Sequence, residues 1–111
     1  MASSTLIVNK GVNTIADTPE IIYTSPTNGN GTIITAFTAA NNSSSNKSYK
    51  AYIVDKDDTA NNPQLPFRVV IWDDIDLGTG IEGQTIPPGG TLQVEANDID
   101  AVYFTVSGKE T

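Results

Sequence analysis

Turn-forming residues interrupt this sequence so often that no helix of ordinary length fits between them. Gly, Pro, Asn, Asp and Ser favour the backbone conformations of turns, and clusters of them recur at short intervals. The clusters are Lys10-Gly11, Thr18-Pro19, Pro26 to Gly31, Asn41 to Asn46, Asp55 to Pro66, Asp73 to Gly83, Pro87 to Gly90 and Asn97-Asp98. No window of ten residues free of Gly and Pro shows the apolar spacing of an amphipathic helix. We therefore predict an all-β chain with little or no helix.

The segments between these turns have the composition of short strands. Thr, Val, Ile and Tyr, which favour strands, are frequent in them. The segments are Thr5 to Asn9, Glu20 to Ser25, Thr32 to Asn41, Ser48 to Asp55, Phe67 to Trp72, Thr91 to Ala96 and Ala101 to Ser107. Six to eight short strands at this spacing predict an antiparallel β-sandwich, either Ig-like or jelly-roll-like. At 111 residues the chain has the size of one domain, so we expect residues 1–111 to form a single sandwich.

Two pairs of these segments are predicted to form hairpins. In Thr91 to Ala96 and in Ala101 to Ser107 apolar side chains alternate with polar ones, so each segment has one buried face. The turn between them favours an antiparallel pair. Glu20 to Ser25 and Thr32 to Asn41 form the second predicted hairpin, because the Asn28-Gly29-Asn30-Gly31 run supplies positive-φ positions for the reversal.

The segment Thr32 to Asn41 does not alternate strictly. Ile34 and Ala36 are expected to share one face of the strand, but other apolar residues do not fit that register. The misfits are Ile33, Phe37 and Ala39. A β-bulge, or a strand buried on both sides, accounts for this pattern.

Charge and composition exclude several classes of function. Six basic against thirteen acidic residues give a net charge of -7, which disfavours binding to nucleic acid or to an anionic membrane surface. We therefore expect a protein partner. The chain has no Cys and no His, which excludes disulfides, thiol catalysis, structural zinc and a Ser-His-Asp triad. The apolar run Leu6 to Val8 is too short for a signal peptide or a membrane span, so we expect synthesis and retention in the cytoplasm.

The acidic residues gather in turns. The groups are Asp55, Asp57 and Asp58, then Asp73, Asp74 and Asp76, then Asp98 and Asp100. Turn carboxylates that cap the backbone and solvate loops explain them better than catalysis does. Calcium, which prefers several oxygen ligands from flexible loops, stays open as an alternative. We predict no catalytic, cofactor-binding or metal-ligating residue and no cofactor.

Two apolar features are candidates for an interface. Leu6, Ile7 and Val8 lie in an otherwise polar terminus, so residues 1–11 form either an edge strand or an arm that augments the sheet of a neighbour. Trp72, the lone Trp, is either a core residue or an interface anchor.

Several short motifs together resemble one group of proteins. They are Tyr23-Thr24-Ser25-Pro26, Asn41-Asn42, Pro87-Pro88-Gly89-Gly90-Thr91-Leu92 and Val106-Ser107-Gly108-Lys109-Glu110. In this order they resemble the small β-sandwich virion proteins of tailed bacteriophages, and the similarity covers most of residues 15–110. The resemblance implies a capsid decoration (cement) protein that binds at capsomer junctions.

The same resemblance implies partners and a location. The partners are the major capsid protein or other virion proteins, and the chain itself as a homo-oligomer such as a trimer. The location is the virion, after synthesis in the host cytoplasm. The contact candidates are the loops Pro26 to Gly31 and Asn41 to Asn46 and the N-terminal arm.

Other functions stay open at this point. One is a component of the neck, tail or fibre. A second is a carbohydrate-binding module for the host surface, whose exposed aromatic side chains would be Tyr23, Tyr49, Tyr52 or Tyr103. A third is a calcium-stabilised adhesin or fibre subunit of cellular origin.

Overall fold

Nine strands and no helix form in the part of the chain that the computed structural model describes. That part comprises residues 4–58 and 75–111 with their side chains and residues 65–72 by their backbone. The strands are β1 (Thr5–Val12), β2 (Glu20–Thr24), β3 (Thr32–Asn41), β4 (Lys47–Val54), β5 (Leu65–Trp72), β6 (Ile75–Asp76), β7 (Thr85–Ile86), β8 (Thr91–Ala96) and β9 (Val102–Glu110). The prediction of an all-β fold is confirmed. The seven predicted segments correspond to β1 to β5, β8 and β9, whereas β6 and β7 were not predicted.

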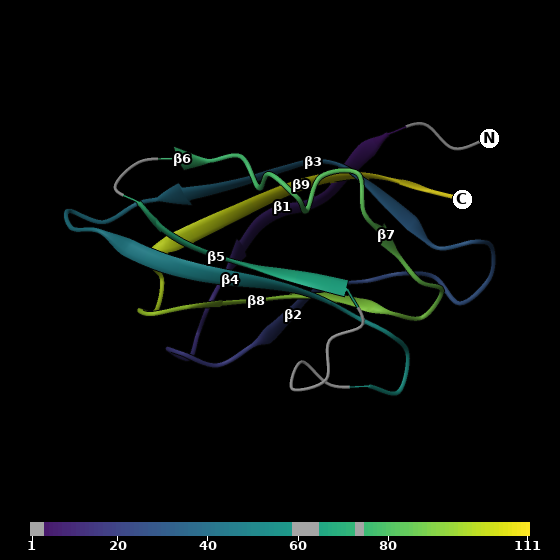
Figure 1. The fold of residues 1–111 in the computed structure, drawn as a ribbon, viewed down its shortest axis with the longest axis horizontal. Coiled ribbons are helices and arrows are strands. Elements are labelled where there is room, and N and C mark those ends of the chain that lie inside the picture. The colour runs from purple at the N-terminus through teal and green to yellow at the C-terminus, as the bar shows by residue number, and fades with distance from the viewer. Residues whose placement is uncertain (1–3, 59–64, 73–74) are drawn as a thin grey trace.

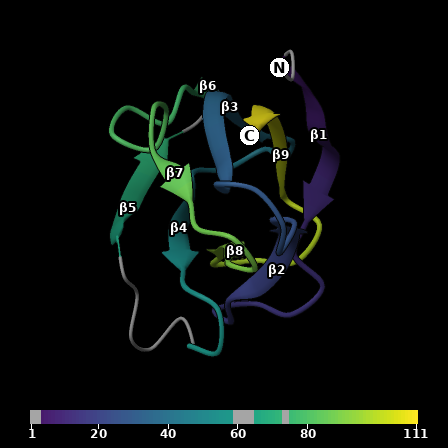
Figure 2. The same ribbon diagram turned by 90° about the vertical axis from the view of Figure 1, so that its right-hand side faces the viewer.

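The strands form two sheets that lie face to face, as Figures 1 and 2 show from two directions. Sheet A has the order β1-β9-β3-β6, with β7 also paired to β3. Sheet B has the order β2-β8-β4-β5. All of these strand pairs are antiparallel. The predicted antiparallel β-sandwich is therefore the observed fold.

The strand order distinguishes the two predicted kinds of sandwich. The chain changes sheet at each step from β1 to β4, and again from β5 to β6, from β7 to β8 and from β8 to β9. In an Ig fold, by contrast, the first two strands share one sheet and the last two share the other. With β6 and β7 counted as one interrupted strand, the eight strands have the winding of a jelly roll.

Both predicted hairpins are wrong in their partners. β8 pairs with β2 and β4, while β9 pairs with β1 and β3, so these consecutive strands lie in opposite sheets. β2 and β3 are separated in the same way. Alternation shows which face of a strand is buried, but two strands with buried faces can meet across a core as well as side by side. The described hairpin is instead β4–β5.

Of the two explanations for the irregular pattern of β3, a bulge or burial on both sides, the structure shows the bulge. The pairing of β3 with β9 shifts register between Ile34 and Ala36. The extra residue turns Ile34, Phe37 and Ala39 into the core and leaves Ala36 exposed. The expectation that Ile34 and Ala36 share a face is therefore wrong, because the bulge lies between them.

An aromatic cluster joins the two sheets at the centre of the core. The ring of Tyr49 from sheet B lies 5.9 Å from Phe37 and 5.4 Å from Phe104, both from sheet A. The Tyr49 hydroxyl donates a hydrogen bond of 2.5 Å to Oδ2 of Asp76 in β6. Tyr49, a core residue of sheet B, thus holds β6, the edge strand of sheet A, in place.

Residues 77–84 connect β6 to β7 and pack against the edge of β3. Gly78 has a φ of 66°, and a Cβ atom there would lie 2.4 Å from Cδ1 of Phe37. Ile81 is buried in the core, and the Gly83 amide donates to the Ile34 carbonyl. This segment therefore covers the core beside β3, although its sequence reads as an open loop.

Candidate interaction surface

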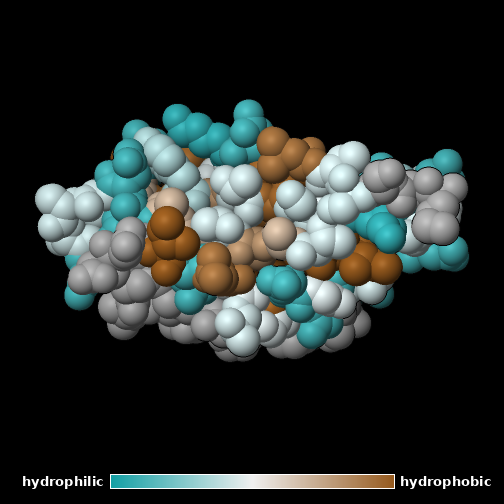
Figure 3. Space-filling view, turned by 90° about the horizontal axis from the view of Figure 1, so that it is seen from above, coloured by the Kyte–Doolittle hydropathy of each residue, from teal (hydrophilic) through white to brown (hydrophobic). Residues whose placement is uncertain are grey.

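The outer face of sheet A is built from small and β-branched side chains. Figure 3 views this face from above and shows weakly polar and hydrophobic side chains along its middle, with much of the hydrophilic colour along its upper edge. The outward positions of β3 and β9 are Ile33, Ala36, Thr38 and Ala40, and Tyr103, Thr105, Ser107 and Lys109. An outer face of an antiparallel sheet is ordinarily rich in charged residues. We name these residues, with Leu6, Val12 and Lys10 of β1 and Ile75 of β6, the sheet A face.

Charge is scarce on the sheet A face and has one sign. The three long strands of sheet A contain three charged residues, Lys10, Lys109 and Glu110. Glu110 lies at the end of β9 and accepts a hydrogen bond from the Tyr23 hydroxyl of sheet B, so it turns away from the outer face. The ammonium group of Lys10 lies 4.6 Å from the centroid of the Tyr103 ring. A chain with a net charge of -7 thus presents an outer sheet face whose described charges are lysines.

Large apolar side chains flank the same face at both edges of sheet A. Leu6 is 55% exposed in β1, and Ile75 is 56% exposed in β6. Leu77, two residues after Ile75, is 64% exposed. Single exposed hydrophobic residues are common on soluble proteins, but a face with apolar edges and hardly any charge is typical of a protein contact.

A second surface lies at the end of the sandwich where β1 turns into β2 and β8 turns into β9. We name residues 13–19 and 97–101 the loop end. Ile15 is 56% exposed and Ile99 is 54% exposed there. The Asp100 amide donates to the Asn13 carbonyl at 3.0 Å, which joins the two loops. The loop end therefore presents two isoleucines on connected loops.

The carboxylates of Glu20 and Asp98 bind the loops that carry these isoleucines. Glu20 accepts hydrogen bonds from the amides of Thr14 and Ile15, from the Thr14 hydroxyl and from the Asn13 amide group. Partial burial is the largest single influence and raises the pKa of Glu20, but these four hydrogen bonds together outweigh it and lower the pKa. At the other loop, a hydrogen bond from Lys47 lowers the pKa of Asp98.

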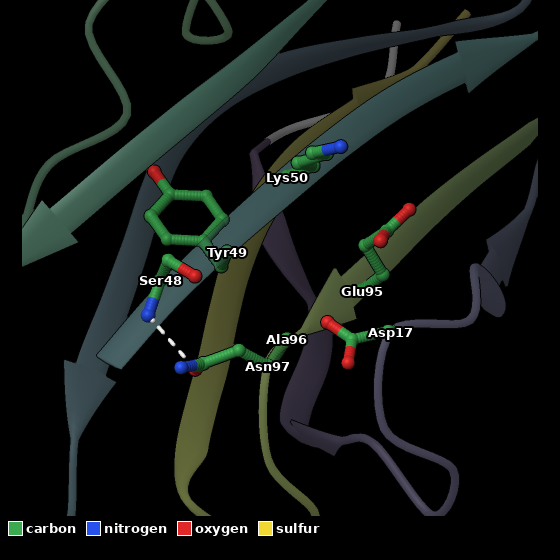
Figure 4. Close-up of a pocket in the computed structure, with 7 residues that line it drawn as sticks. All are labelled: Asp17, Ser48, Tyr49, Lys50, Glu95, Ala96 and Asn97. Atoms are coloured by element: carbon green, nitrogen blue, oxygen red, sulfur yellow. Dashed lines mark hydrogen bonds between the residues drawn. The ribbon is translucent and has the colours of Figure 1, made fainter.

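A shallow hollow of about 70 Å³ lies beside the loop end. Figure 4 shows the acidic side chains of Asp17 and Glu95 on one side of it and Ser48 and Tyr49 on the other. The Ser48 amide donates to Oδ1 of Asn97 at 3.0 Å. Sites for small molecules usually measure about 300–1,000 Å³. This hollow is too small to enclose a sugar or a cofactor.

The tyrosines do not form exposed stacking surfaces. Tyr49 is buried in the core, which contradicts its expected role as an exposed aromatic residue. Tyr23 and Tyr52 are half-buried, and their hydroxyls donate to Glu110 and Glu95. Burial, and then the hydrogen bond to Glu110, raises the pKa of Tyr23 to about 12. Tyr103 is half-buried beneath Lys10.

The predicted interface residues lie in different environments. Leu6 is exposed on the sheet A face, Ile7 is half-buried against the core, and Val8 is a core residue. All three belong to β1, which pairs with β9 at the edge of sheet A. Trp72 ends β5 at the edge of sheet B, and its side chain lies outside the described residues. The structure therefore does not bring Trp72 and Leu6 together on one sheet.

The predicted contact loops are also apart. The loop after β2 (residues 26–31) and the loop after β3 (residues 42–46) lie at opposite ends of the ten-residue strand β3 (Figure 1). The second of these loops adjoins the loop end, because the Asn42 amide donates to the Ala101 carbonyl.

Neither a metal cluster nor a membrane helix occurs in the described residues. No group of three or more acidic side chains there is arranged to hold a metal ion. Asp73 and Asp74 of the predicted acidic cluster lie outside the described residues. No helix in the same part of the chain is long and apolar enough to cross a membrane.

Comparisons with known proteins give no match: no protein-family model, no curated protein and no solved structure is similar enough to this chain. Function must therefore be inferred from the surfaces themselves.

Most residues of the sheet A face were not predicted from the sequence as contact residues. Ile75 and the outward residues of β3 were not among the predicted contact residues. Lys10 was included only as part of the expected N-terminal arm, and Tyr103 only as an exposed aromatic residue for sugar binding. A usable signal was present, because the strands Thr32–Asn41 and Val102–Glu110 hold hardly any charge at the positions that alternate with buried ones.

Proposed function

We propose that this protein is a non-enzymatic virion structural protein, a capsid decoration (cement) protein of a tailed bacteriophage that stabilises the head at capsomer junctions. The observation that carries this proposal is the sheet A face, which is nearly free of charge and flanked by Leu6, Ile75 and Leu77. Such a face suits contacts with other proteins of the particle. Lys10 and Lys109 would meet acidic groups there.

The size of the sheet A face is consistent with a specific protein contact. Four neighbouring strands about 4.8 Å apart, the longest of ten residues and so about 34 Å long, give the sheet A face on the order of 600 Å². A standard protein interface covers about 800 Å² on each partner. The sheet A face, together with the exposed side chains at its edges, therefore approaches the size of a specific contact.

A decoration protein needs no chemistry, because binding itself stabilises the shell. A ligand that binds only the expanded shell stabilises that state by mass action, by about 2.7 kcal/mol per site when its free concentration is 100 times Kd. The same gain is repeated at each site on the particle. A rigid sandwich is suited to this role, because little conformational entropy is lost when it binds.

The jelly-roll topology supports the proposal by analogy. This topology recurs in viral capsid domains and in lectin domains, and fold alone does not decide between such functions. The small hollow beside the loop end and the buried or half-buried tyrosines favour the structural role over sugar binding. The sheet A face has little charge and apolar edges, which is typical of a surface that contacts another protein.

The copy number of this chain in purified virions tests the proposal. Quantitative mass spectrometry would compare the chain with the major shell protein of the same particles. A number comparable with that of the shell protein is expected for a decoration protein. A small number that matches the symmetry of the neck, tail or fibre would contradict the head location, and absence from the particle would overturn the virion role.

A further inference from the structure

We infer that the sheet A face binds the loop end of a second copy of this chain, so that the protein assembles head to tail into a closed ring. This inference rests on the proposed function, in which the sheet A face is a protein interface, and it names a copy of the chain as one partner of that face. The loop end is the complementary surface.

The loop end is ordered before any partner binds. The Ile15 amide donates to Oε1 of Glu20, and the Asp17 amide donates to the Ala96 carbonyl at 2.8 Å. On the second loop, the Ile99 amide donates to Oδ1 of Asp98. Each exposed isoleucine is therefore held by hydrogen bonds at or near its own amide. A surface that is already fixed loses less conformational entropy on binding than a flexible loop does.

The backbone conformation of two aspartates also indicates that the loop end is ordered before a partner binds. Asp17 and Asp100 adopt φ values of 54° and 52°, in the left-handed region that few residues other than Gly occupy. Asp tolerates this region better than most residues, and the hydrogen bonds to Ala96 and Asn13 hold both positions there. These two positions set the course of the loops and so the direction in which Ile15 and Ile99 point.

The charges of the two surfaces are opposite. The loop end carries the carboxylates of Asp17 and Asp100, besides that of Asp98, which is paired with Lys47, whereas the described charges of the sheet A face are Lys10 and Lys109. Two copies that met face to face would bring lysines near lysines and leave every acidic group outside the contact. Contact between loop end and face would instead pair opposite charges around the apolar contact.

The arrangement of the two surfaces allows each copy to use both at once. In Figure 1 sheet A forms the upper layer, and the β1–β2 and β8–β9 turns lie together at one end of the sandwich. An interface between two different surfaces is heterologous, and repeated head-to-tail contact closes into a ring when the rotation between copies permits.

Sedimentation velocity of the purified full chain tests the inference with two complementary variants. Lys10→Glu/Lys109→Glu disables the face and leaves the loop end intact. Ile15→Ser/Ile99→Ser disables the loop end and leaves the face intact. The wild type is expected to sediment as a small oligomer, and each variant alone as a monomer. All four positions are described as exposed or half-buried, and a thermal melt of each variant confirms that it is folded.

A mixture of the two variants decides between interface types. In a head-to-tail assembly the intact loop end of the first variant binds the intact face of the second, so the mixture forms one-to-one dimers that grow no further. If the mixture stays monomeric while the wild type assembles, the contact is not head to tail and the inference is overturned. A monomeric wild type, or a Lys10→Glu/Lys109→Glu variant that assembles like the wild type, would also overturn it.

The same proteins separate failure of the inference from failure of the proposed function. If the wild type is monomeric in solution but abundant in purified virions, the ring is wrong and the decoration role stands. If the protein forms the ring and is absent from virions, the proposed function is wrong and the ring stands.

Discussion

The ammonium group of Lys10 lies over the ring of Tyr103, 4.6 Å from its centroid, on a sheet face where no outward-facing described residue is acidic. A cation over an aromatic face at an exposed site gains about 0.5–1 kcal/mol. This contact fixes the position of the lysine without neutralising its charge. Lys10 therefore stays available to meet an acidic group of a neighbouring protein.

Loss of the Tyr49 hydroxyl is expected to destabilise the protein. Tyr49→Phe removes the hydrogen bond to Asp76, and bonds to charged groups contribute about 1.5–3 kcal/mol. We expect a loss of about 2 kcal/mol in the free energy of unfolding, measured by urea denaturation. Tyr52→Phe is the matched control, because its bond to Glu95 is on the outer face of sheet B, and we expect a loss below about 1 kcal/mol. Equal losses in the two variants would contradict the role of Tyr49 as the link to β6.

A methyl group at position 78 is expected to displace the segment that covers the core. In Gly78→Ala the new Cβ would lie 2.4 Å from the Phe37 ring, at a positive φ. Overpacking and backbone strain together should cost about 3 kcal/mol. Gly80→Ala has the same kind of strain at a φ of 96° but meets no atom within 4 Å, so about 1 kcal/mol is expected. Thermal melts of both variants check the difference, and a Gly78→Ala protein as stable as Gly80→Ala would contradict the packing against Phe37.

Acid should weaken the loop end through Glu20. The pKa of Glu20 is lower in the folded protein than its usual value near 4.5, so the unfolded chain binds more protons in this range. The stability that Glu20 contributes is therefore present above pH 4.5 and is lost as the pH falls through the folded pKa. The difference in urea midpoint between the wild type and Glu20→Gln should be large at pH 7 and should shrink towards zero in acid.

The control for this acid effect is Glu82→Gln, at an exposed position in the 77–84 segment. Its difference from the wild type should stay small at both pH values. A Glu20→Gln protein whose deficit is unchanged in acid would show that the charge of Glu20 does not hold the loop.

Alkali should act through Tyr23. Its pKa is raised from 10 to about 12, first by burial and then by the hydrogen bond to Glu110. A raised pKa means that the contribution of Tyr23 to stability is present below pH 10 and is lost as the pH rises through about 12. Subtracting the phenolate absorbance of Tyr23→Phe from that of the wild type should give a transition near pH 12. A transition near pH 10 would contradict the partial burial of Tyr23 and its hydrogen bond to Glu110.

The sequence was sufficient to predict the strands, because the signals that define a strand lie within a few neighbouring residues. Turn residues and alternation act over a few positions, so the segments corresponding to β3 and β8 were placed with the bounds that the structure shows. The register defect in β3 was also visible, because Ile34 and Phe37 cannot both face inward without an extra residue between them.

Strand partners could not be predicted from the same signals. The turn 97–100 is short enough for a hairpin, yet the chain crosses from sheet B to sheet A there because β9 fills the place between β1 and β3. That choice depends on all the other strands at once. The pairing of Tyr49 with Asp76 was equally hidden, since 27 positions separate the two residues.

The interaction surface was only partly visible in the sequence. An apolar run pointed to Leu6, Ile7 and Val8, but only Leu6 is exposed. Ile7 faces the core because successive residues of a strand alternate, and the register shift between Leu6 and Val8 turns Val8 inward as well. Absence of charge, rather than presence of hydrophobic residues, distinguishes the face, and this property appears only when the outward positions of β1, β9 and β3 are placed side by side.

The central claim is that neighbouring proteins cover the sheet A face. Lysine acylation of the protein within intact virions tests this claim most directly. Mass spectrometry would compare the labelling of each lysine in the particle with its labelling in the free Ile15→Ser/Ile99→Ser variant, which is expected to be monomeric with its sheet A face intact. We predict that Lys10 and Lys109 lose most of their reactivity in the particle, while Lys56, exposed after β4 on the other sheet, reacts equally in both states. If Lys10 and Lys109 react in the particle as fully as Lys56 does, the sheet A face is not the interface.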